Sequence, residues 1–285
     1  MRSTRTRRGA RSTGAGVRRG SLTIVGTGIR LVGQTTLEAL AAMQRADKLF
    51  YLVADRATET WIRRLNASAT TLEDCYDEGK RRSVSYREMA DLIVGAVRSG
   101  LDVCVAYYGH PGVFVTSAHA AIRRARRAGF PARMLPGVSA EDCLYADLAV
   151  DPAPNGSQNF EATDFLAARR RFDPTSALIL WQVGVLGEPS VRRNMSCRPD
   201  RLRVLTAHLR RFYPARHRVV LYKAAQLPIM QPVIKAVALQ RLPREAVGPL
   251  MTLYVPPLPS ERFDAKILRW YSEPEPITSR AGAVP

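Results

Sequence analysis

The chain has 285 residues, of which 46% are hydrophobic and 24% are charged, so it can form one large or two modest packed domains. No apolar run approaches the roughly 20 residues that a membrane-spanning helix needs, and the arginine-rich N-terminus leads into no secretory signal. We therefore expect a soluble, cytoplasmic protein that makes no membrane contact.

The formal net charge is +18 and is unevenly distributed. Residues 1–20 contain seven arginines and no acidic residue, which predicts a disordered basic tail. Subtracting these seven charges from +18 leaves +11 on the remaining residues. Such a field favours an acidic partner or nucleic acid, although arginines that simply face solvent are the plainer interpretation.

The cysteines lie 29, 39 and 54 residues apart, and neither they nor the four histidines have the spacing of a zinc site or a compact disulfide framework. We therefore expect no metal. The cysteines are Cys75, Cys104, Cys143 and Cys197.

Apolar runs typical of buried strands alternate with helical periodicity through the first half of the chain. Ser85 and Glu88 have the spacing of a capping box, which predicts the start of one helix. The alternation indicates a parallel α/β sheet, and it defines a predicted domain over residues 21–136. The predicted strands are 22–25, 49–53, 103–107 and 132–135, and the predicted helices are 36–45, 58–65, 85–100 and 117–127.

The pattern changes at the Pro-Gly break of residues 136–137. A helix is expected to begin near Ser139, because acidic residues occupy the turn that follows it. Residues 151–159 are rich in Pro, Gly and Asn and are predicted to form a loop. These features predict a second α/β domain over residues 137–271 and a frayed tail over 272–285. Its expected strands are 178–183, 219–222 and 250–255, with a helix at 199–211.

Two turns follow predicted strands, at the ends where ligands bind in open α/β sheets. Residues 26–28 form an incomplete dinucleotide motif, because Leu31 stands in place of its third glycine, and a tight turn is the simpler interpretation. Residues 107–114 contain two glycines and a proline, which would force a turn and leave peptide groups free to meet an adenosine-type ligand. A third candidate is the cluster of Tyr76, Arg82 and Tyr86 around a basic loop, although by spacing alone side chains on a surface loop are the simpler interpretation.

Three long segments closely resemble the methyltransferase domain of the borosin family. The family transfers methyl groups from S-adenosylmethionine to backbone amide nitrogens of a ribosomally made peptide. The likeness covers residues 20–260, and motifs of this length in this order are highly specific. The segments are residues 20–28 (GSLTIVGTG), 108–115 (YGHPGVFV) and 133–148 (RMLPGVSAEDCLYADL), with shorter matches at 46–51, 76–80 and 181–184.

The wider superfamily is that of the tetrapyrrole (corrin and porphyrin) methylases. This resemblance implies an α/β fold of two domains, with a parallel sheet in the N-terminal domain, a mixed sheet in the C-terminal domain and the cofactor in the cleft between them. Tetrapyrrole relatives typically carry Asp-Pro after the third strand, whereas His110 and Pro111 stand there in this sequence, as in borosin enzymes. That difference counts against a corrin substrate.

The family's functional residues carry over to matching positions of this chain. The resemblance implies that the catalytic residues are Tyr76, Arg82, Tyr86 and Tyr108. It implies that the cofactor contacts are Tyr108, His110, Val113, Phe114, Ser139, Ala140, Gln182, Ala224 and Thr252. One further tyrosine that some members carry upstream of Tyr76 is Glu73 here.

These residue types suit the chemistry of amide methylation. A peptide nitrogen is a poor nucleophile because its lone pair is delocalised into the carbonyl. Arg82 could support the imidate oxygen as a permanent cation, and Tyr76 or Tyr86 could remove the N–H proton if a nearby cation lowered its ordinary pKa of about 10. Tyr108 would orient the amide toward the methyl donor.

Many borosin enzymes carry their own substrate as a C-terminal extension, but only a dozen proline-rich residues follow the last predicted element here. We therefore expect a separate precursor peptide in trans, and, as in the family, a homodimer that binds two precursor chains. The alternatives are a superfamily methyltransferase that acts on a tetrapyrrole or RNA, and a non-catalytic RNA-binding protein. No aromatic-plus-basic stacking motif supports the last.

Overall fold

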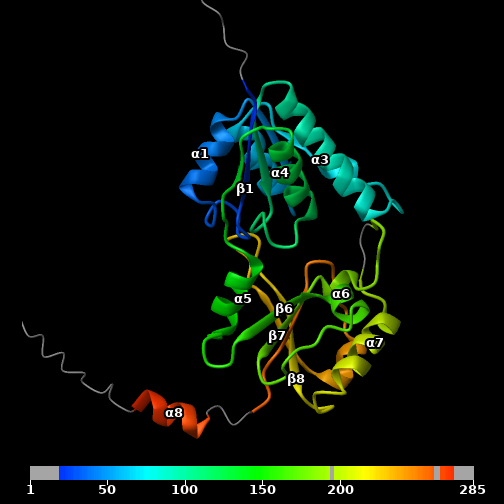
Figure 1. Cartoon of the computed structure of the whole chain (residues 1–285). Helices are drawn as coiled ribbons and strands as arrows, with labels where there is room; N and C mark the ends of the chain where they lie inside the picture. The colour runs from blue at the N-terminus through cyan, green and yellow to red at the C-terminus, as the bar shows by residue number, and fades with distance from the viewer. Residues whose placement is uncertain (1–18, 193–195, 260–263, 273–285) are drawn as a thin grey trace, which may run out of the picture.

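The computed structural model describes residues 19–192, 196–259 and 264–272, and it shows two α/β domains placed end to end (Figure 1). Most of the predicted tails, 1–20 and 272–285, lie outside the described residues. The expected fold is confirmed: a parallel five-stranded sheet precedes a mixed five-stranded sheet.

The N-terminal sheet has the strand order β3-β2-β4-β1-β5, and every pair is parallel. A parallel sheet is covered on both faces, so its central strands are continuously apolar. In β4, Val103 and Val105 face one helical layer while Cys104 and Ala106 face the other. The strands are β1 (Ser21–Gly26), β2 (Lys48–Leu52), β3 (Thr70–Thr71), β4 (Asp102–Tyr107) and β5 (Ala132–Met134).

Helices cover the two faces of this sheet in pairs. The pair α1 (Leu37–Arg45) and α2 (Arg56–Leu65) packs on one face, and the pair α3 (Arg82–Arg98) and α4 (Thr116–Arg127) packs on the other. The neighbouring strands β1 and β4 therefore lead into helices on opposite faces. Their carboxyl ends form a switch point, the place where open α/β sheets bind ligands.

One predicted helix start is wrong. Ser85 does not cap α3, because the helix begins one turn earlier at Arg82 and the Ser85 side chain is fully buried within it. The first helical N–H, that of Arg82, donates to the carbonyl of Pro189 in the other domain at 3.1 Å. A tertiary contact thus takes the place of the expected local cap.

The C-terminal sheet has the order β6-β7-β10-β8-β9, in which only β6 and β7 are parallel. One face packs against α6 (Ala162–Ala167) and α7 (Pro199–Leu209), and the other packs against α5 (Ala140–Leu148). Ser139 caps α5 in a capping box with Asp142. The strands are β6 (Ser157–Glu161), β7 (Ala177–Trp181), β8 (Arg218–Lys223), β9 (Val233–Ala238) and β10 (Thr252–Val255).

Two strands of this sheet were not predicted. Part of β6 falls in the expected loop 151–159, and β9 has no counterpart in the prediction. Both are edge strands, and neither has a continuous buried face from which a strand could be recognised.

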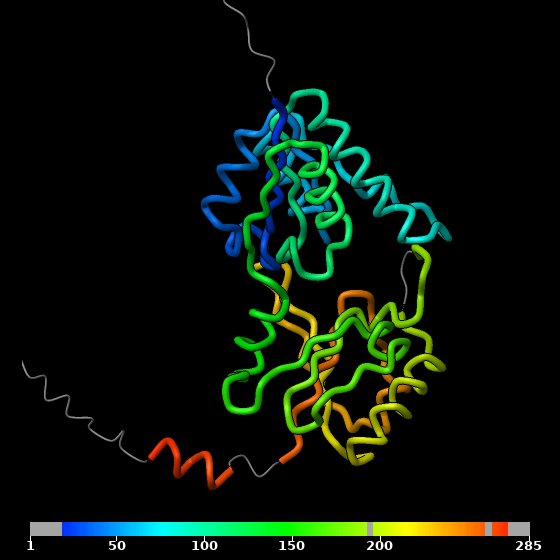
Figure 2. Tube along the Cα trace, in the orientation of Figure 1, coloured from blue at the N-terminus to red at the C-terminus, as the bar shows by residue number. Residues whose placement is uncertain are grey.

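The chain passes between the domains near the centre of the molecule, where residues 135–139 lead into α5 (Figure 2). The last described helix, α8 (Ala265–Ser272), buries none of its residues and lies at the far end of the C-terminal domain (Figure 1). None of the helices in the described ranges is long and apolar enough to cross a membrane.

Candidate functional site

A cavity of about 570 Å³ lies where the carboxyl ends of β1 and β4 face the C-terminal domain. Its volume is in the range of small-molecule and cofactor sites. Every residue predicted for catalysis or cofactor contact lines it, although the residues come from both domains. They are Tyr76, Arg82, Tyr86, Tyr108, His110, Val113, Phe114, Ser139, Ala140, Gln182, Ala224 and Thr252.

Three glycines allow the turns beneath this cavity to pack backbone against backbone. A Cβ on Gly26 would lie 2.2 Å from the carbonyl oxygen of Gly109, and one on Gly137 would lie 3.0 Å from the same atom. Gly109 itself has φ +71, in the left-handed region that glycine adopts at little cost. The motif of residues 26–28 is thus a tight turn that brings the β4 turn to the edge of the cavity.

The β4 turn is held by its own hydrogen bonds. The amide of Gly112 donates to Nδ1 of His110 at 2.9 Å, and the amide of Val113 donates to the His110 carbonyl at 3.2 Å. Phe114 then adopts φ +56, a conformation that costs a non-glycine residue energy and is typical of functional sites. Phe114 is 42% exposed, and its ring centroid lies 5.9 Å from that of Trp181 on β7, so the two rings together offer an aromatic wall to a ligand.

The C-terminal domain supplies the opposite wall. Gln182 follows β7 and also has a left-handed backbone, with φ +57. Tyr222 on β8 is fully buried, and its hydroxyl donates to Oδ2 of Asp147 on α5 at 2.7 Å. The hydroxyl and the backbone amide of Ser139 both donate to Oδ2 of Asp142, so the capping box fixes this residue at the wall of the cavity.

The predicted catalytic residues form a cluster on the N-terminal side. Tyr76 follows a short 3-10 helix (η1, Glu73–Cys75), and Arg82 and Tyr86 lie one turn apart at the start of α3. The rings of Tyr76 and Tyr86 meet edge to face, with centroids 6.4 Å apart. Tyr108 joins them from the end of β4, and all four side chains line the same cavity.

Burial governs the ionisation of two of these tyrosines. It raises the pKa of the Tyr76 phenol well above its ordinary value, Tyr86 acts in the same direction, and the opposing influence of Arg82 is smaller. Burial also raises the pKa of Tyr108 to about 12, against a lowering contribution from the Gln226 side chain. The condition for a tyrosine base, a phenol pKa lowered by a nearby cation, is therefore not met at Tyr76, because burial outweighs Arg82.

Two further hollows adjoin the central cavity. One of about 320 Å³ is bordered by apolar residues such as Leu52 and Val53, and one of about 560 Å³ is bordered by polar residues such as Thr163 and Glu161. All three spaces share Tyr86, Phe114 and Gln182. The three hollows are therefore contiguous around these side chains.

Sequence reasoning missed several lining residues. Trp181 directly precedes Gln182 in the segment 181–184, which resembles the borosin family, so that resemblance was the available signal. Tyr222, Val191 and Arg192 come from segments without a distinctive motif, and only the fold brings them to the cavity. Among the described residues there is no group of three or more His, Cys, Asp or Glu that could hold a metal ion.

The fold and the interdomain cavity define the class of protein. The family model described as Tetrapyrrole (Corrin/Porphyrin) Methylases matches residues 21–238, and the chain belongs to this family. Solved structures with the same fold include uroporphyrin-III-C-methyltransferase from Thermus thermophilus, with a TM-score of 0.60, 19% identity and coverage of 84% of this chain and 92% of that one. Diphthine synthase gives a TM-score of 0.58 at 18% identity, covering 83% of this chain and 89% of its own.

Within the family, the chain is similar to proteins described as methyltransferases and cyclic peptide precursors. It is 45% identical to the omphalotin A precursor of Omphalotus olearius over 254 residues, which cover 88% of this chain and 61% of that protein. It is 40% identical to a type I borosin cyclic peptide precursor of Coprinopsis marcescibilis, covering 84% of this chain and 62% of that protein. The chain thus spans less than two thirds of the length of these relatives.

Proposed function

We propose that this chain is an S-adenosylmethionine-dependent methyltransferase that methylates backbone amide nitrogens of a ribosomally made precursor peptide. The observation that carries the proposal is the convergence of all the family-matched residues, from two domains, on one cavity. The similarity to proteins described as borosin precursors and methyltransferases supports the same substrate class.

The residues around the cavity fit this cofactor. The close-packed turns at Gly26, Gly109 and Gly137 bring backbone to the edge of the cavity, where its amide and carbonyl groups can bond a nucleoside. Aromatic faces at Phe114 and Trp181 can meet an adenine ring or a sulfonium cation. When bound, S-adenosylmethionine would supply an electrophilic methyl group on a positively charged sulfur.

We assign the proton-accepting role to Tyr86. Burial favours the neutral phenol of Tyr76, which contacts Tyr86 edge to face, and the high pKa of Tyr108 also keeps that residue neutral. Tyr76 and Tyr108 can therefore donate hydrogen bonds, whereas Tyr86 receives the amide proton. Arg82, in the same turn, would stabilise the negative charge that develops on the amide oxygen.

The amide N–H proton would pass to Tyr86 acting as a phenolate, which becomes a neutral phenol, and the nitrogen lone pair would form a bond to the methyl carbon. S-adenosylmethionine would supply that methyl group and would keep the electron pair of the broken carbon–sulfur bond as a neutral thioether. Arg82 faces the imidate oxygen in this step and releases it when the methylated amide regains its carbonyl.

We further propose that the precursor is supplied in trans to a homodimer, which binds two precursor chains. The relatives named above combine enzyme and precursor in one protein, so a fused substrate is the alternative. The apolar side chains of α8 support a dimer, because they are exposed and a second copy of the chain could cover them. They include Ile267, Leu268 and Trp270. Light scattering with and without a candidate precursor would measure the stoichiometry.

The test compares binding and transfer in the same variants. The chain would be incubated with S-adenosylmethionine, alone and with a small protein encoded beside it, while calorimetry measures cofactor affinity. Tyr86→Phe should slow transfer by about 10²- to 10⁴-fold, the usual contribution of a general base, and leave cofactor affinity within about twofold. Tyr145→Phe is the matched control, since its hydroxyl bonds Glu141 and Ser157 outside the cavity. Equal rates for the two variants would contradict the assignment.

A further inference from the structure

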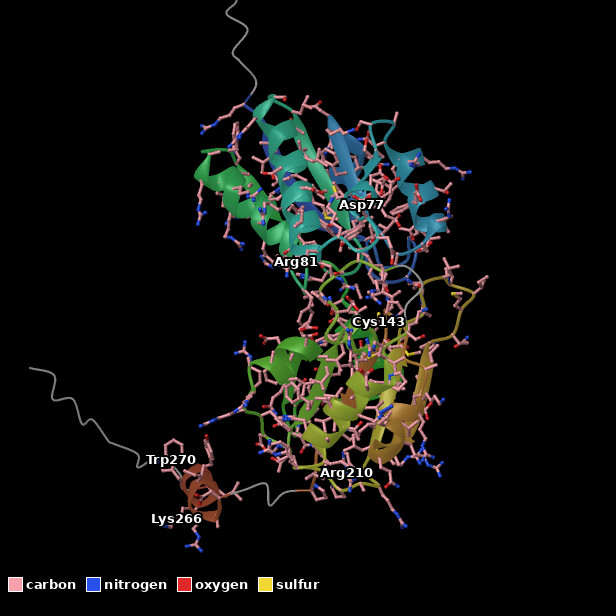
Figure 3. The ribbon with its side chains drawn as sticks, turned by 90° about the vertical axis from the view of Figure 1, so that its right-hand side faces the viewer. Asp77, Arg81, Cys143, Arg210, Lys266 and Trp270 are labelled. Carbon is pink, nitrogen blue, oxygen red and sulfur yellow. The ribbon has the colours of Figure 1, made fainter. Side chains whose placement is uncertain are left out.

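The loop that carries the catalytic cluster is tied to the opposite domain. Residues 79–82 and residues 189–191 pair across the interdomain space, and we call these two segments the strap. Gly79 donates to the Val191 carbonyl at 2.9 Å, Val191 donates to the Lys80 carbonyl at 2.8 Å, and Arg81 pairs with Ser190 as an antiparallel bridge. Figure 2 shows the loop before α3 reaching the segment near residue 190, and Figure 3 places Arg81 at the edge of its domain that faces the other.

The C-terminal half of the strap is anchored by a buried carboxylate. The Glu188 side chain is 4% exposed, and the only cations paired with it among the described residues are Arg201 at 3.3 Å and Arg192 at 3.7 Å. Arg201 on α7 also donates to the Leu186 carbonyl at 3.0 Å, so the carboxylate is linked to the packed core of its domain. Burial would raise the pKa of Glu188, but the Ser190 amide and the two guanidinium groups outweigh it and hold the pKa below the ordinary value.

A single residue connects this anchor to Arg82. The amide of Ser190 donates to Oε1 of Glu188 at 3.3 Å, and the carbonyl of Ser190 accepts from Nε of Arg82 at 3.4 Å. The backbone amide of Arg82 donates to the Pro189 carbonyl at 3.1 Å, so the strap also holds the first turn of α3. Lys80 fixes the loop from its own domain by donating to the Cys75 carbonyl and pairing with Glu88.

We propose that Glu188 is a positioning residue for methyl transfer, which holds the strap closed and aims Arg82 at the substrate through Ser190. This role rests on the proposed function, because Arg82 acts there on the amide oxygen. Glu188 lines only the polar hollow beside the central cavity and reaches Arg82 through the backbone. Its carboxylate therefore fixes geometry and does not take part in the chemistry.

The first test measures hydrogen exchange of the free protein. Glu188→Gln keeps the shape of the side chain but removes the charge that holds Arg201 and Arg192. Peptides covering residues 79–82 and 189–192 should exchange at least about tenfold faster than in the wild type, while those from β4 and β7 stay unchanged. Asp200→Asn is the matched control, because it removes a carboxylate that pairs with Arg198 near the same end of α7 and has no contact with the strap.

The second test measures kinetics. Glu188→Gln should lower kcat by about 10- to 100-fold, the range expected when a catalytic group is misplaced, with cofactor affinity within about twofold. In an Arg82→Lys background, Glu188→Gln should have little further effect on kcat. Both substitutions impair the same function, which is the placement of the Arg82 guanidinium against the substrate. If Glu188→Gln unfolds at the assay temperature, Arg201→Lys provides a milder loosening of the same anchor.

Unchanged exchange of the strap in Glu188→Gln would overturn the proposal, and so would fully additive losses in the double variant. A wild-type chain that methylates no peptide would instead count against the proposed function. In that case the exchange experiment still decides whether Glu188 holds the strap, since it needs neither cofactor nor substrate.

Discussion

The contact between Gly184 and Gly248 allows a sharp prediction about the wall of the cavity. A Cβ on Gly184 would lie 1.7 Å from the carbonyl oxygen of Gly248 and 2.8 Å from the nitrogen of Pro249. Ordinary contact begins near 3.4 Å, so Gly184→Ala requires the two backbones to separate by about 1.7 Å. Backbone cannot rotate away as a side chain can, so the cost should reach or exceed about 3 kcal/mol, the upper end for overpacking.

This separation would also damage the site, because Gln182 precedes Gly184 and Pro249 borders the cavity. Thermal unfolding should show a midpoint lowered by roughly 6–12 °C, from about 2–4 °C per kcal/mol at this size, and calorimetry should show at least about tenfold weaker binding of S-adenosylmethionine. Gly248→Ala is the matched control on the other side of the contact, since a Cβ there meets nothing within 4 Å. A Gly184→Ala protein as stable as Gly248→Ala would refute the reasoning.

Three further predictions concern stability. Tyr222→Phe should cost about 1–3 kcal/mol in chemical denaturation, because it leaves Asp147 without the buried hydroxyl that donates at 2.7 Å; an unchanged midpoint would mean that solvent replaces this bond. Gly95→Ala should raise stability by about 1 kcal/mol, because the position lies inside α3 and a Cβ there meets nothing within 4 Å; a lower melting temperature would contradict this account of the helix surface. Burial, with a smaller contribution from Arg211, lowers the pKa of His208, whose Nε2 is buried without a partner. The contribution of His208 to the free energy of unfolding is therefore constant above about 6.5, the pKa of histidine in the unfolded chain. It declines as the pH falls through that value toward the lower pKa of the folded state. The melting temperature should therefore fall as the pH is lowered from about 7.5 to about 5, and this dependence on pH should be weaker in His208→Phe. An identical dependence in the variant would exclude His208 as its source.

The central strands of the parallel sheet were predictable because they are buried on both faces and are therefore continuous apolar runs, whereas the two-residue edge strand β3, Thr70–Thr71, was missed. Residues 103–107 show this directly, and the strand was placed within one residue of β4. The polar edge strand β6 was missed because its sequence, SQNFE, resembles the loop that precedes it. Its pairing with β7 is a tertiary event that local patterns do not encode.

The candidate site was predictable where its residues lie within the matched segments. His110 and Phe114 follow a recognisable strand, and the family resemblance added Gln182, Ala224 and Thr252 from segments whose proximity only the fold creates. The strap was not predictable, because residues 79–82 and 189–191 lie more than a hundred positions apart and contain no shared pattern. The same pairing explains the early start of α3, where the Pro189 carbonyl replaces a local cap.

The most direct test of the proposed function is fragmentation mass spectrometry of a candidate precursor after incubation with the wild-type chain and S-adenosylmethionine. We predict successive gains of one methylene in mass, each located on a backbone nitrogen, and their loss in Arg82→Ala. Methyl groups located on side chains, or no mass gain despite measurable cofactor binding, would contradict backbone methylation and leave only the methylase fold.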